Sequence, residues 1–207
     1  MQAPLDPPRH QMPAYYARRA PEFDDWWEGT GLFEGRDLPG WTQELAELDA
    51  VLASLPAARV LDLGCGTGFV TRKLHATSLV ALDQSASMLK RARTRLPGVR
   101  FVRADGLALP FSAATFDRVF TSHVYGHVLP EERARFRAEA RLVAREIVVV
   151  DAGPRGAGSR DEWQERRLQD GSAHRVYKRF FTASGLLAEW GGRRVLHDGH
   201  WFVAVTT

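Results

Sequence analysis

The sequence contains a single cysteine, Cys65, in 207 residues. One cysteine excludes an internal disulfide and any zinc site built from clustered cysteines. Long apolar runs are also missing: no stretch approaches the roughly 18 residues that a membrane-spanning helix needs. The first twenty residues hold early prolines where a signal peptide would be apolar. These absences predict a cytoplasmic protein with no membrane partner and no metal.

The sequence also lacks a large net charge, because its 28 basic residues are nearly balanced by 25 acidic ones. That small margin does not indicate a nucleic-acid-binding surface. The length, together with a hydrophobic content of 44%, is enough for the core of one domain. We expect a mobile leader over residues 1–12, an N-terminal helical cap or lid over 13–55, and the main domain over 56–207.

The stretch from Val60 to Phe69 is typical of a buried strand that runs into a glycine-rich turn and then opens a helix, expected over residues 69–75. Glycines at positions 64, 66 and 68 let backbone approach a nucleotide-like ligand, because they place no side chain in its way. Asp62 adds a negative charge that a phosphate-binding turn would lack. The turn is therefore predicted to bind a ligand that carries a cation.

Two more acids follow predicted strands. Asp83 ends the apolar run 79–82, and Asp105 follows the alternating run 99–103. The carboxyl ends of parallel strands meet at one edge of a sheet, so we expect these acids to face the same crevice as Asp62. Asp83 is placed where a carboxylate accepts from both hydroxyls of a ribose.

Helices and strands alternate along the rest of the main domain, which predicts an α/β fold with a doubly wound, mostly parallel sheet. Three helices are expected to begin at the side-chain caps Thr42, Ser85 and Thr182. Further expectations are strands over 116–123 and 146–151, a helix over 130–144, a flexible joint over 153–159, helical turns over 162–168, an extended segment over 174–181 and a terminal hairpin that turns at Asp198-Gly199.

Two aromatic segments have two interpretations each. The N-terminal residues Tyr15, Tyr16, Phe23, Trp26 and Trp27 form either a helix packed on the main domain or a lid that closes over the ligand. The second segment, part of an insertion over 152–181, is either an acceptor pocket for a carboxylated or phosphorylated small molecule or a strand packed on the sheet edge. It combines Trp163, Tyr177, Phe180 and Phe181 with Arg175, Lys178 and Arg179.

With the run Asp62-Leu63-Gly64-Cys65-Gly66-Thr67-Gly68 followed by Asp83 and Asp105, the sequence resembles the class I S-adenosylmethionine-dependent methyltransferases from about Val60 to Val150. Residues 15–27 also look like the leader of small bacterial members. The resemblance implies a Rossmann-like seven-stranded sheet with a reversed last strand. It also implies S-adenosylmethionine as the cofactor and S-adenosylhomocysteine as the product.

Carried over to this sequence, the family pattern places Gly64, Gly66 and Gly68 beside the methionine part of the cofactor and Asp62 near its ammonium group. It places Asp83 on the ribose hydroxyls and Asp105, with backbone from Gly106, on the adenine amino group. The remaining cofactor contacts expected from the resemblance are Tyr16, Cys65, Gln84, Met88, Ser122 and His123.

The resemblance implies in-line transfer of a methyl group to a small-molecule acceptor. A histidine near neutrality can take a proton from a hydroxyl or acid acceptor. His123 is the first candidate, because it ends the fourth strand, and His127 and His174 come next; packing is the alternative role for His123 and His127. Tyr16 and Tyr125 are candidates for ring contacts with the sulfonium.

Two other functions stay open at this point. One is a non-catalytic module that binds S-adenosylmethionine or S-adenosylhomocysteine, and the other is a methyltransferase directed at RNA or protein. No Asn/Asp-Pro-Pro-aromatic motif follows the fourth strand, which argues against methylation of amino groups on nucleic-acid bases. Cys65 lies in the cofactor turn and is not placed to attack a pyrimidine. A monomer or homodimer is expected.

Overall fold

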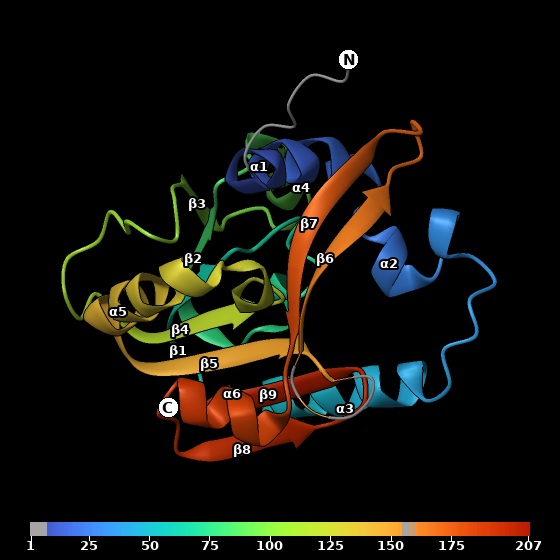
Figure 1. The fold of residues 1–207 in the computed structure, drawn as a ribbon. Coiled ribbons are helices and arrows are strands. Elements are labelled where there is room, and N and C mark those ends of the chain that lie inside the picture. Colours follow the sequence, from blue (N-terminus) through green and yellow to red (C-terminus); the bar gives the residue numbers. More distant parts are fainter. Residues whose placement is uncertain (1–7, 155–157, 159) are drawn as a thin grey trace.

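A seven-stranded sheet organises the computed structural model, which describes residues 8–154, 158 and 160–207 (Figure 1). Across the sheet, the strands are β3 (Arg100–Arg103), β2 (Ala76–Asp83), β1 (Ala58–Leu63), β4 (Phe116–Ser122), β5 (Ala144–Ala152), β9 (Phe202–Thr206) and β8 (Arg194–Asp198). Strands β1 to β5 pair in parallel, whereas β9 runs antiparallel to β5 and β8. The predicted doubly wound sheet with a reversed last strand is confirmed, as is the terminal hairpin.

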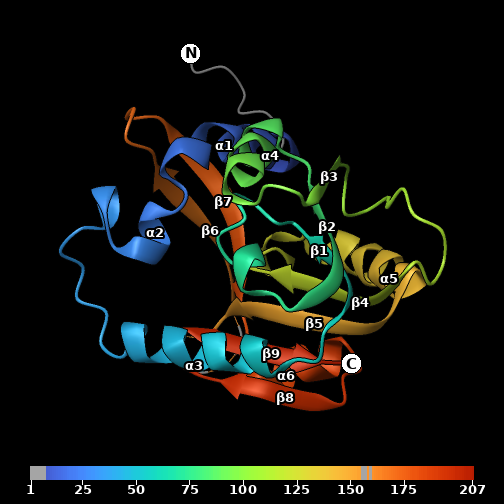
Figure 2. The same ribbon diagram turned by 180° about the vertical axis from the view of Figure 1, so that it is seen from behind.

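Helices cover both faces of the sheet (Figures 1 and 2). On one face, α5 (Arg133–Val143) and α6 (Ala183–Glu189) pack against alternate residues of the strands, and α3 (Trp41–Ser54) packs on the other. The central run 147–150 of β5 is fully buried, because it is covered on both sides. This burial explains why the strand is continuously apolar in sequence.

Two of the three predicted helix caps are confirmed. Ser85 precedes α4 (Ala86–Arg95) and accepts the N–H of Met88, and Thr182 precedes α6 and accepts the N–H of Gly185. The prediction for Thr42 was wrong. Helix α3 begins one residue earlier, after Gly40 at φ 76°, so Thr42 lies inside its first turn.

The prediction of a helix over residues 69–75 was also wrong. Only a short 3-10 helix, Thr71–Lys73, follows the glycine turn, and β2 already begins at Ala76. Phe69 is stacked on Trp27 with ring centroids 5.3 Å apart, and the Thr71 hydroxyl donates to Asp62 at 2.5 Å. These two contacts fix the backbone just after the turn, and α3 covers this face of the sheet in place of a longer crossover helix.

A separate two-stranded sheet forms from β6 (Arg160–Arg167) and β7 (Ala173–Phe180), which pair antiparallel. The extended segment predicted over 174–181 is confirmed, but the helical turns predicted over 162–168 were wrong. Residues 160–167 are polar except for Trp163, and they alternate in burial, because one side of β6 faces the protein and the other faces solvent. Of the joint expected over 153–159, positions 155–157 and 159 lie outside the described residues.

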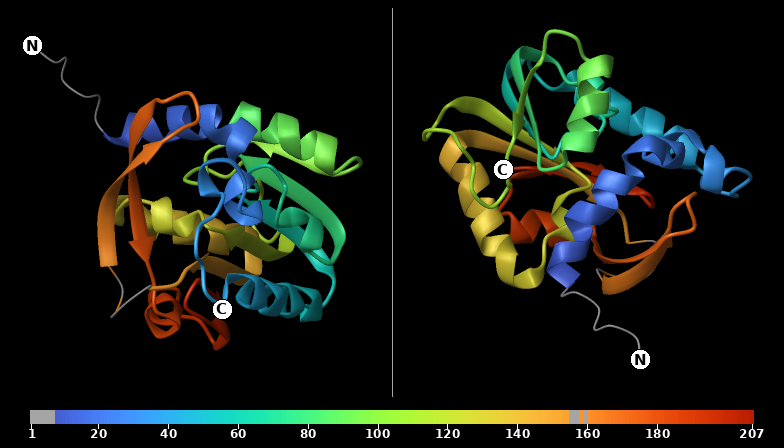
Figure 3. Two further views of the ribbon diagram at one scale, coloured as in Figure 1. Left: turned by 90° about the vertical axis from the view of Figure 1, so that its right-hand side faces the viewer. Right: turned by 90° about the horizontal axis from the view of Figure 1, so that it is seen from above.

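The N-terminal segment crosses the carboxyl ends of the strands. Helix α1 (Pro8–Arg19) begins within the leader expected over 1–12, contacts both β7 and α4, and is followed by the short helix α2 (Asp25–Glu28) (Figure 3). Residues 1–7 lie outside the described part of the chain. None of the described helices combines the length and apolar character needed to cross a membrane.

Candidate functional site

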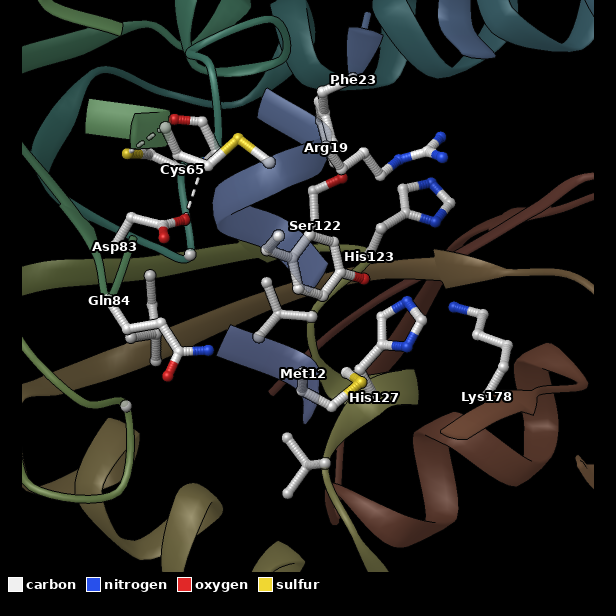
Figure 4. Close-up of a pocket in the computed structure, with 18 of the residues that line it drawn as sticks. Met12, Arg19, Phe23, Cys65, Asp83, Gln84, Ser122, His123, His127 and Lys178 are labelled. Atoms are coloured by element: carbon white, nitrogen blue, oxygen red, sulfur yellow. Dashed lines mark hydrogen bonds between the residues drawn. The ribbon is translucent and has the colours of Figure 1, made fainter. Parts of the chain in front are cut away.

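A cavity of about 730 Å³ lies at the carboxyl ends of β1, β2 and β4. The N-terminal segment and the β6–β7 hairpin contribute its other walls. Figure 4 shows Cys65, Asp83 and Gln84 on one side, and His123, His127 and Lys178 on the other. We call these the acidic side and the basic side.

The glycine turn on the acidic side leaves no room for a side chain at its first glycine. Gly64 has φ 84°, and a Cβ placed there would lie 2.2 Å from Cγ2 of Val124. The N–H groups of Gly64 and Cys65 both donate to the carbonyl of Leu82, at 2.8 and 2.9 Å, so the turn folds back over the end of β2. The turn therefore presents backbone, not side chains, to the cavity.

Asp83 ends β2 beside this turn and is held by backbone donors. Its Oδ2 accepts the N–H of Gly66 at 2.9 Å, and its Oδ1 accepts the N–H of Ser85 at 2.8 Å. Burial raises the pKa of this carboxyl, while the backbone donors oppose the shift. Each oxygen of a carboxylate has a second lone pair, so a fixed Asp83 can still accept from a diol.

Asp62 is more deeply buried, with only 2% of its surface exposed. Its Oδ2 accepts the Thr71 hydroxyl at 2.5 Å. Burial raises the pKa of this carboxyl to about 7, and the neighbouring Asp83 charge adds to the shift. A cationic group placed next to Asp62 would favour its ionised form, because opposite charges stabilise each other.

Asp105 follows β3 and lines the same side of the cavity. It is exposed, and its Oδ1 accepts the N–H of Leu107 at 2.9 Å. The next residue, Gly106, packs tightly, because a Cβ there would lie 2.9 Å from the ring of Phe136. The three predicted acids therefore do converge on one cavity, each at a strand end.

His123 follows β4 in a left-handed backbone conformation, with φ 57°. A non-glycine residue adopts this conformation at a cost, and such strain concentrates at functional sites. The His123 ring packs edge-on against Trp26 and Trp27, with centroids 5.3 and 5.1 Å away. Aromatic residues of the N-terminal segment thus meet the end of the fourth strand inside the cavity.

His127 lines the basic side with a defined tautomer. Its Nδ1 lies 2.6 Å from the carbonyl oxygen of Tyr177. A carbonyl only accepts, so Nδ1 carries the proton and Nε2 bears a lone pair. Burial lowers the pKa of His127 well below its usual value, and the cations Lys178 and Arg166 lower it further. The ring is therefore neutral at pH 7.

Lys178, on β7, forms a buried ion pair with Asp151, with Nζ 2.6 Å from Oδ1. Asp151 also accepts the N–H of Gly126 at 2.7 Å and that of Ala152 at 2.8 Å. Burial raises the pKa of Asp151, but the attraction of Lys178 and His123 and the hydrogen bonds from Lys178 and Ala152 together outweigh it, so the pKa lies below its usual value. The pair is ionised and fixes Lys178 at the cavity wall.

Most of the residues predicted to contact a cofactor line the cavity: Tyr16, Asp62, Gly64, Cys65, Gly66, Asp83, Gln84, Met88, Asp105, Gly106, Ser122 and His123. Gly68 does not line it; this residue packs against α4, where a Cβ would lie 2.9 Å from Leu96. His174 does not line it either, and contacts Tyr15 and Ser172. Tyr125 lies in the core, where its hydroxyl bonds to Glu189 and Arg137.

Of the seven residues named for the predicted acceptor pocket in the segment 163–181, Lys178 and Phe180 line the cavity, whereas Trp163 and Arg175 are exposed. Sequence reasoning missed Arg19 and Arg166, which line the basic side. Nothing in the sequence distinguishes Arg19 among 28 basic residues. For Arg166 the alternation of β6 was the available signal, because as a strand it places residues 164 and 166 on the same face.

Comparison with known sequences gives a family for the central part of the chain. A family model described as a methyltransferase domain matches residues 60–146. A malonyl-[acyl-carrier protein] O-methyltransferase of Enterobacter lignolyticus is 39% identical over 97 residues, 42% of this chain and 39% of that protein. A phthiotriol/phenolphthiotriol dimycocerosates methyltransferase of Mycobacterium leprae is 37% identical over 105 residues, 46% of this chain and 37% of that protein. The matched region thus spans about two fifths of each relative.

Solved structures match over a larger part of the chain. The DhpI-SAM-HEP complex superimposes with a TM-score of 0.77 and 26% identity, covering 99% of both chains. The 1,6-didemethyltoxoflavin-N1-methyltransferase of Burkholderia thailandensis, solved with S-adenosylhomocysteine, has a TM-score of 0.63 and 18% identity. It covers 100% of this chain and 92% of that one, and its likeness shows the fold. The sheet order, the glycine turn and the family match identify residues 60–146 as a class I S-adenosylmethionine-dependent methyltransferase domain.

Proposed function

We propose that this chain binds S-adenosylmethionine in the cavity and transfers its methyl group to a small-molecule acceptor by in-line displacement. The observation that carries the proposal is the fixed carboxylate of Asp83 beside the glycine turn, with the N–H of Gly66 on one of its oxygens. A second, buried carboxylate, Asp62, lies on the same side of the cavity. Together they suit a ligand that has a diol and a cation.

Three features of the cavity fit this cofactor. Its volume of about 730 Å³ lies within the roughly 300–1,000 Å³ of small-molecule pockets. The turn at Gly64 brings bare backbone to the cavity wall, because Val124 leaves no room for a Cβ there. The hydroxyl of Ser122 is buried at the end of β4 and has no hydrogen-bond partner in the described part of the chain, so a ligand can supply one.

In this proposal Asp83 holds the ribose, Asp62 neutralises the ammonium group, and Asp105 accepts from the adenine amino group. When bound, the cofactor supplies a methyl group on a sulfonium, which is already an activated donor. The main work of the protein is then to align the acceptor. Tyr16, Phe23 and Trp26 of the N-terminal segment line the cavity, and in this proposal they shield the reacting groups from water.

The cavity also offers a base for a methyl acceptor that must lose a proton. His123 is placed at the end of β4, where its ring lines the cavity. His127 is neutral and has its Nε2 lone pair available, because Nδ1 is committed to the Tyr177 carbonyl. His123 and His127 therefore stay the candidate bases, and His174 ranks behind both, since it does not line the cavity.

The relatives support a small-molecule acceptor, because two solved neighbours are named with small ligands: a DhpI-SAM-HEP complex and a methyltransferase that holds 1,6-didemethyltoxoflavin. Calorimetric titration with S-adenosylmethionine and S-adenosylhomocysteine tests the cofactor. A labelled-methyl screen against a metabolite extract then tests transfer. We expect binding of both compounds and at least one labelled small molecule. Tight binding without transfer to any acceptor would favour a non-catalytic binding module instead.

A further inference from the structure

The basic side of the cavity holds more positive charge than its neighbours neutralise. Arg19 and Arg166 both line it, and Arg19 is only 7% exposed. No carboxylate in the described ranges lies within ion-pair distance of either guanidinium. Glu132 also lines the cavity but makes no ion pair with either in those ranges. Buried charges are normally paired, so the buried Arg19 and the half-buried Arg166, both without a carboxylate partner in the described ranges, indicate an anion-binding site.

The contacts of these two arginines position them without neutralising them. Arg166 donates from Nε and Nη2 to the side-chain oxygen of Gln164, at 3.1 and 2.7 Å. The guanidinium of Arg19 lies over the rings of Phe23 and Phe33, 5.7 and 5.3 Å from their centroids. Both are held in place by neutral partners, which leaves their charge for a ligand.

Lys178 adds a third cation, and its partner Asp151 also accepts two backbone N–H groups. The neutral His127 ring lies among these groups, and its lowered pKa is explained by burial together with Lys178 and Arg166. A ligand in the cavity therefore lies between the positive potential of the basic side and the acidic side, which holds Asp62 and Asp83.

We infer that the acceptor is a small oxyanion, a phosphate monoester or a carboxylate, held by Arg19, Arg166 and Lys178 and methylated on an anionic oxygen. This inference rests on the proposed function. The oxygen gives its electron pair to the methyl carbon, and the methyl–sulfur bond breaks with its electrons kept on sulfur. The acceptor loses one negative charge, and no proton has to move. A strong base is not required for such an acceptor.

The chemistry of guanidinium groups supports this assignment. A planar guanidinium binds the two oxygens of a carboxylate or phosphate through parallel hydrogen bonds, and so orients the third oxygen or the attacking lone pair. A neutral alcohol or amine would leave Arg19 and Arg166 without a counter-charge. The basic side consequently selects a methyl acceptor by its negative charge first and by its shape second.

Matched probes test the inference on the whole chain. Ethyl phosphate, propionate and propanol are titrated into protein saturated with S-adenosylhomocysteine, first for the natural sequence and then for Arg166→Gln. The control is Arg135→Gln, which changes an exposed arginine of α5 outside the cavity. We expect at least one anion to bind at least tenfold more tightly than propanol. We also expect Arg166→Gln to weaken anion binding at least tenfold and the control to change it less than twofold.

The outcomes separate the two proposals. Equal affinity for propanol and the anions, or anion binding unchanged by Arg166→Gln in protein that still binds S-adenosylhomocysteine, overturns the oxyanion inference alone. Absence of any heat with S-adenosylmethionine and S-adenosylhomocysteine counts against the proposed function. Preference between ethyl phosphate and propionate distinguishes a phosphate monoester from a carboxylate. Retained cofactor binding in Arg166→Gln shows that the variant is folded.

Discussion

Asp24 and Arg95 form an ion pair, with Oδ2 2.6 Å from Nη2, that ties the N-terminal segment to α4. The other oxygen of Asp24 accepts the hydroxyl of Thr67 at 2.5 Å, and Arg95 donates to the Thr67 carbonyl at 2.9 Å. Thr67 belongs to the glycine turn. The position of the N-terminal segment over the cavity is therefore coupled to the conformation of the turn beneath it.

Breaking this link should loosen the N-terminal segment. We expect Asp24→Ala to lower the free energy of unfolding by about 1–3 kcal/mol, because a hydrogen-bonded charge is lost and Arg95 is left without its carboxylate. Hydrogen exchange of backbone amides over residues 13–40 should become faster. Glu28→Ala, an exposed acid in the same segment, is the control. Identical exchange and unfolding curves for the two variants would show that the ion pair does not hold the segment.

Asp83 should dominate cofactor affinity. We expect Asp83→Ala to weaken binding of S-adenosylhomocysteine about 10–100-fold, or roughly 1.5–3 kcal/mol, because hydrogen bonds to a charged acceptor are removed. Calorimetric titration measures the change. Asp117→Ala is the matched control, since Asp117 is an exposed partner of Arg59 at the amino end of β4. An Asp83→Ala affinity within twofold of the control would remove Asp83 from the site.

Asp62 should make cofactor binding depend on pH. Burial raises the pKa of this carboxyl from 3.8 to about 7, so the folded protein holds one more proton than the unfolded chain between these values. This group's contribution to stability therefore falls as pH rises from about 4 to 7. A cationic ligand favours the ionised carboxylate, so affinity for S-adenosylmethionine should rise as pH rises through about 7.

The same reasoning predicts that binding at pH 6 releases a proton. Titrations in buffers with different heats of ionisation measure that release directly. Asp62→Asn carries no titrating group, and its affinity should be lower and nearly independent of pH over the same range. Proton release that persists in Asp62→Asn would assign it to another group.

Gly64 should be intolerant of any side chain. We expect Gly64→Ala to destabilise the protein and weaken cofactor binding, because its Cβ would lie 2.2 Å from Val124 in a backbone conformation that disfavours alanine. Gly98→Ala has a similar φ, 90°, but its Cβ meets open space. Gly98→Ala therefore shows the destabilisation that comes from the backbone conformation alone. Thermal unfolding of both variants measures how much the contact with Val124 adds in Gly64→Ala. Partial recovery in the double variant Gly64→Ala/Val124→Ala would identify the contact; no recovery would argue against it.

The sheet could be predicted from sequence because its signals are local. Apolar runs such as 147–150 mark buried strands, and the acids and glycines at strand ends mark the crevice of a doubly wound fold. The acidic side of the cavity is built from such strand ends, so Asp62, Asp83 and Asp105 were found together. Their proximity follows from topology alone.

The basic side could not be predicted in the same way. Arg19, Arg166 and Lys178 come from three elements and meet only because α1 and the β6–β7 hairpin cross the cavity. Strand β6 has few apolar residues, and its extended form depends on pairing with β7. The missing helix after the glycine turn likewise depends on Trp27, which is more than forty positions away from Phe69. Such contacts have no local pattern.

The most direct test of the central claim is an experimental structure of the chain with S-adenosylhomocysteine bound. The account predicts the ribose hydroxyls within hydrogen-bond distance of the Asp83 carboxylate, the amino group near Asp62 and the sulfur facing the basic side. A ligand bound outside this cavity, or a ribose that makes no contact with Asp83, would contradict it.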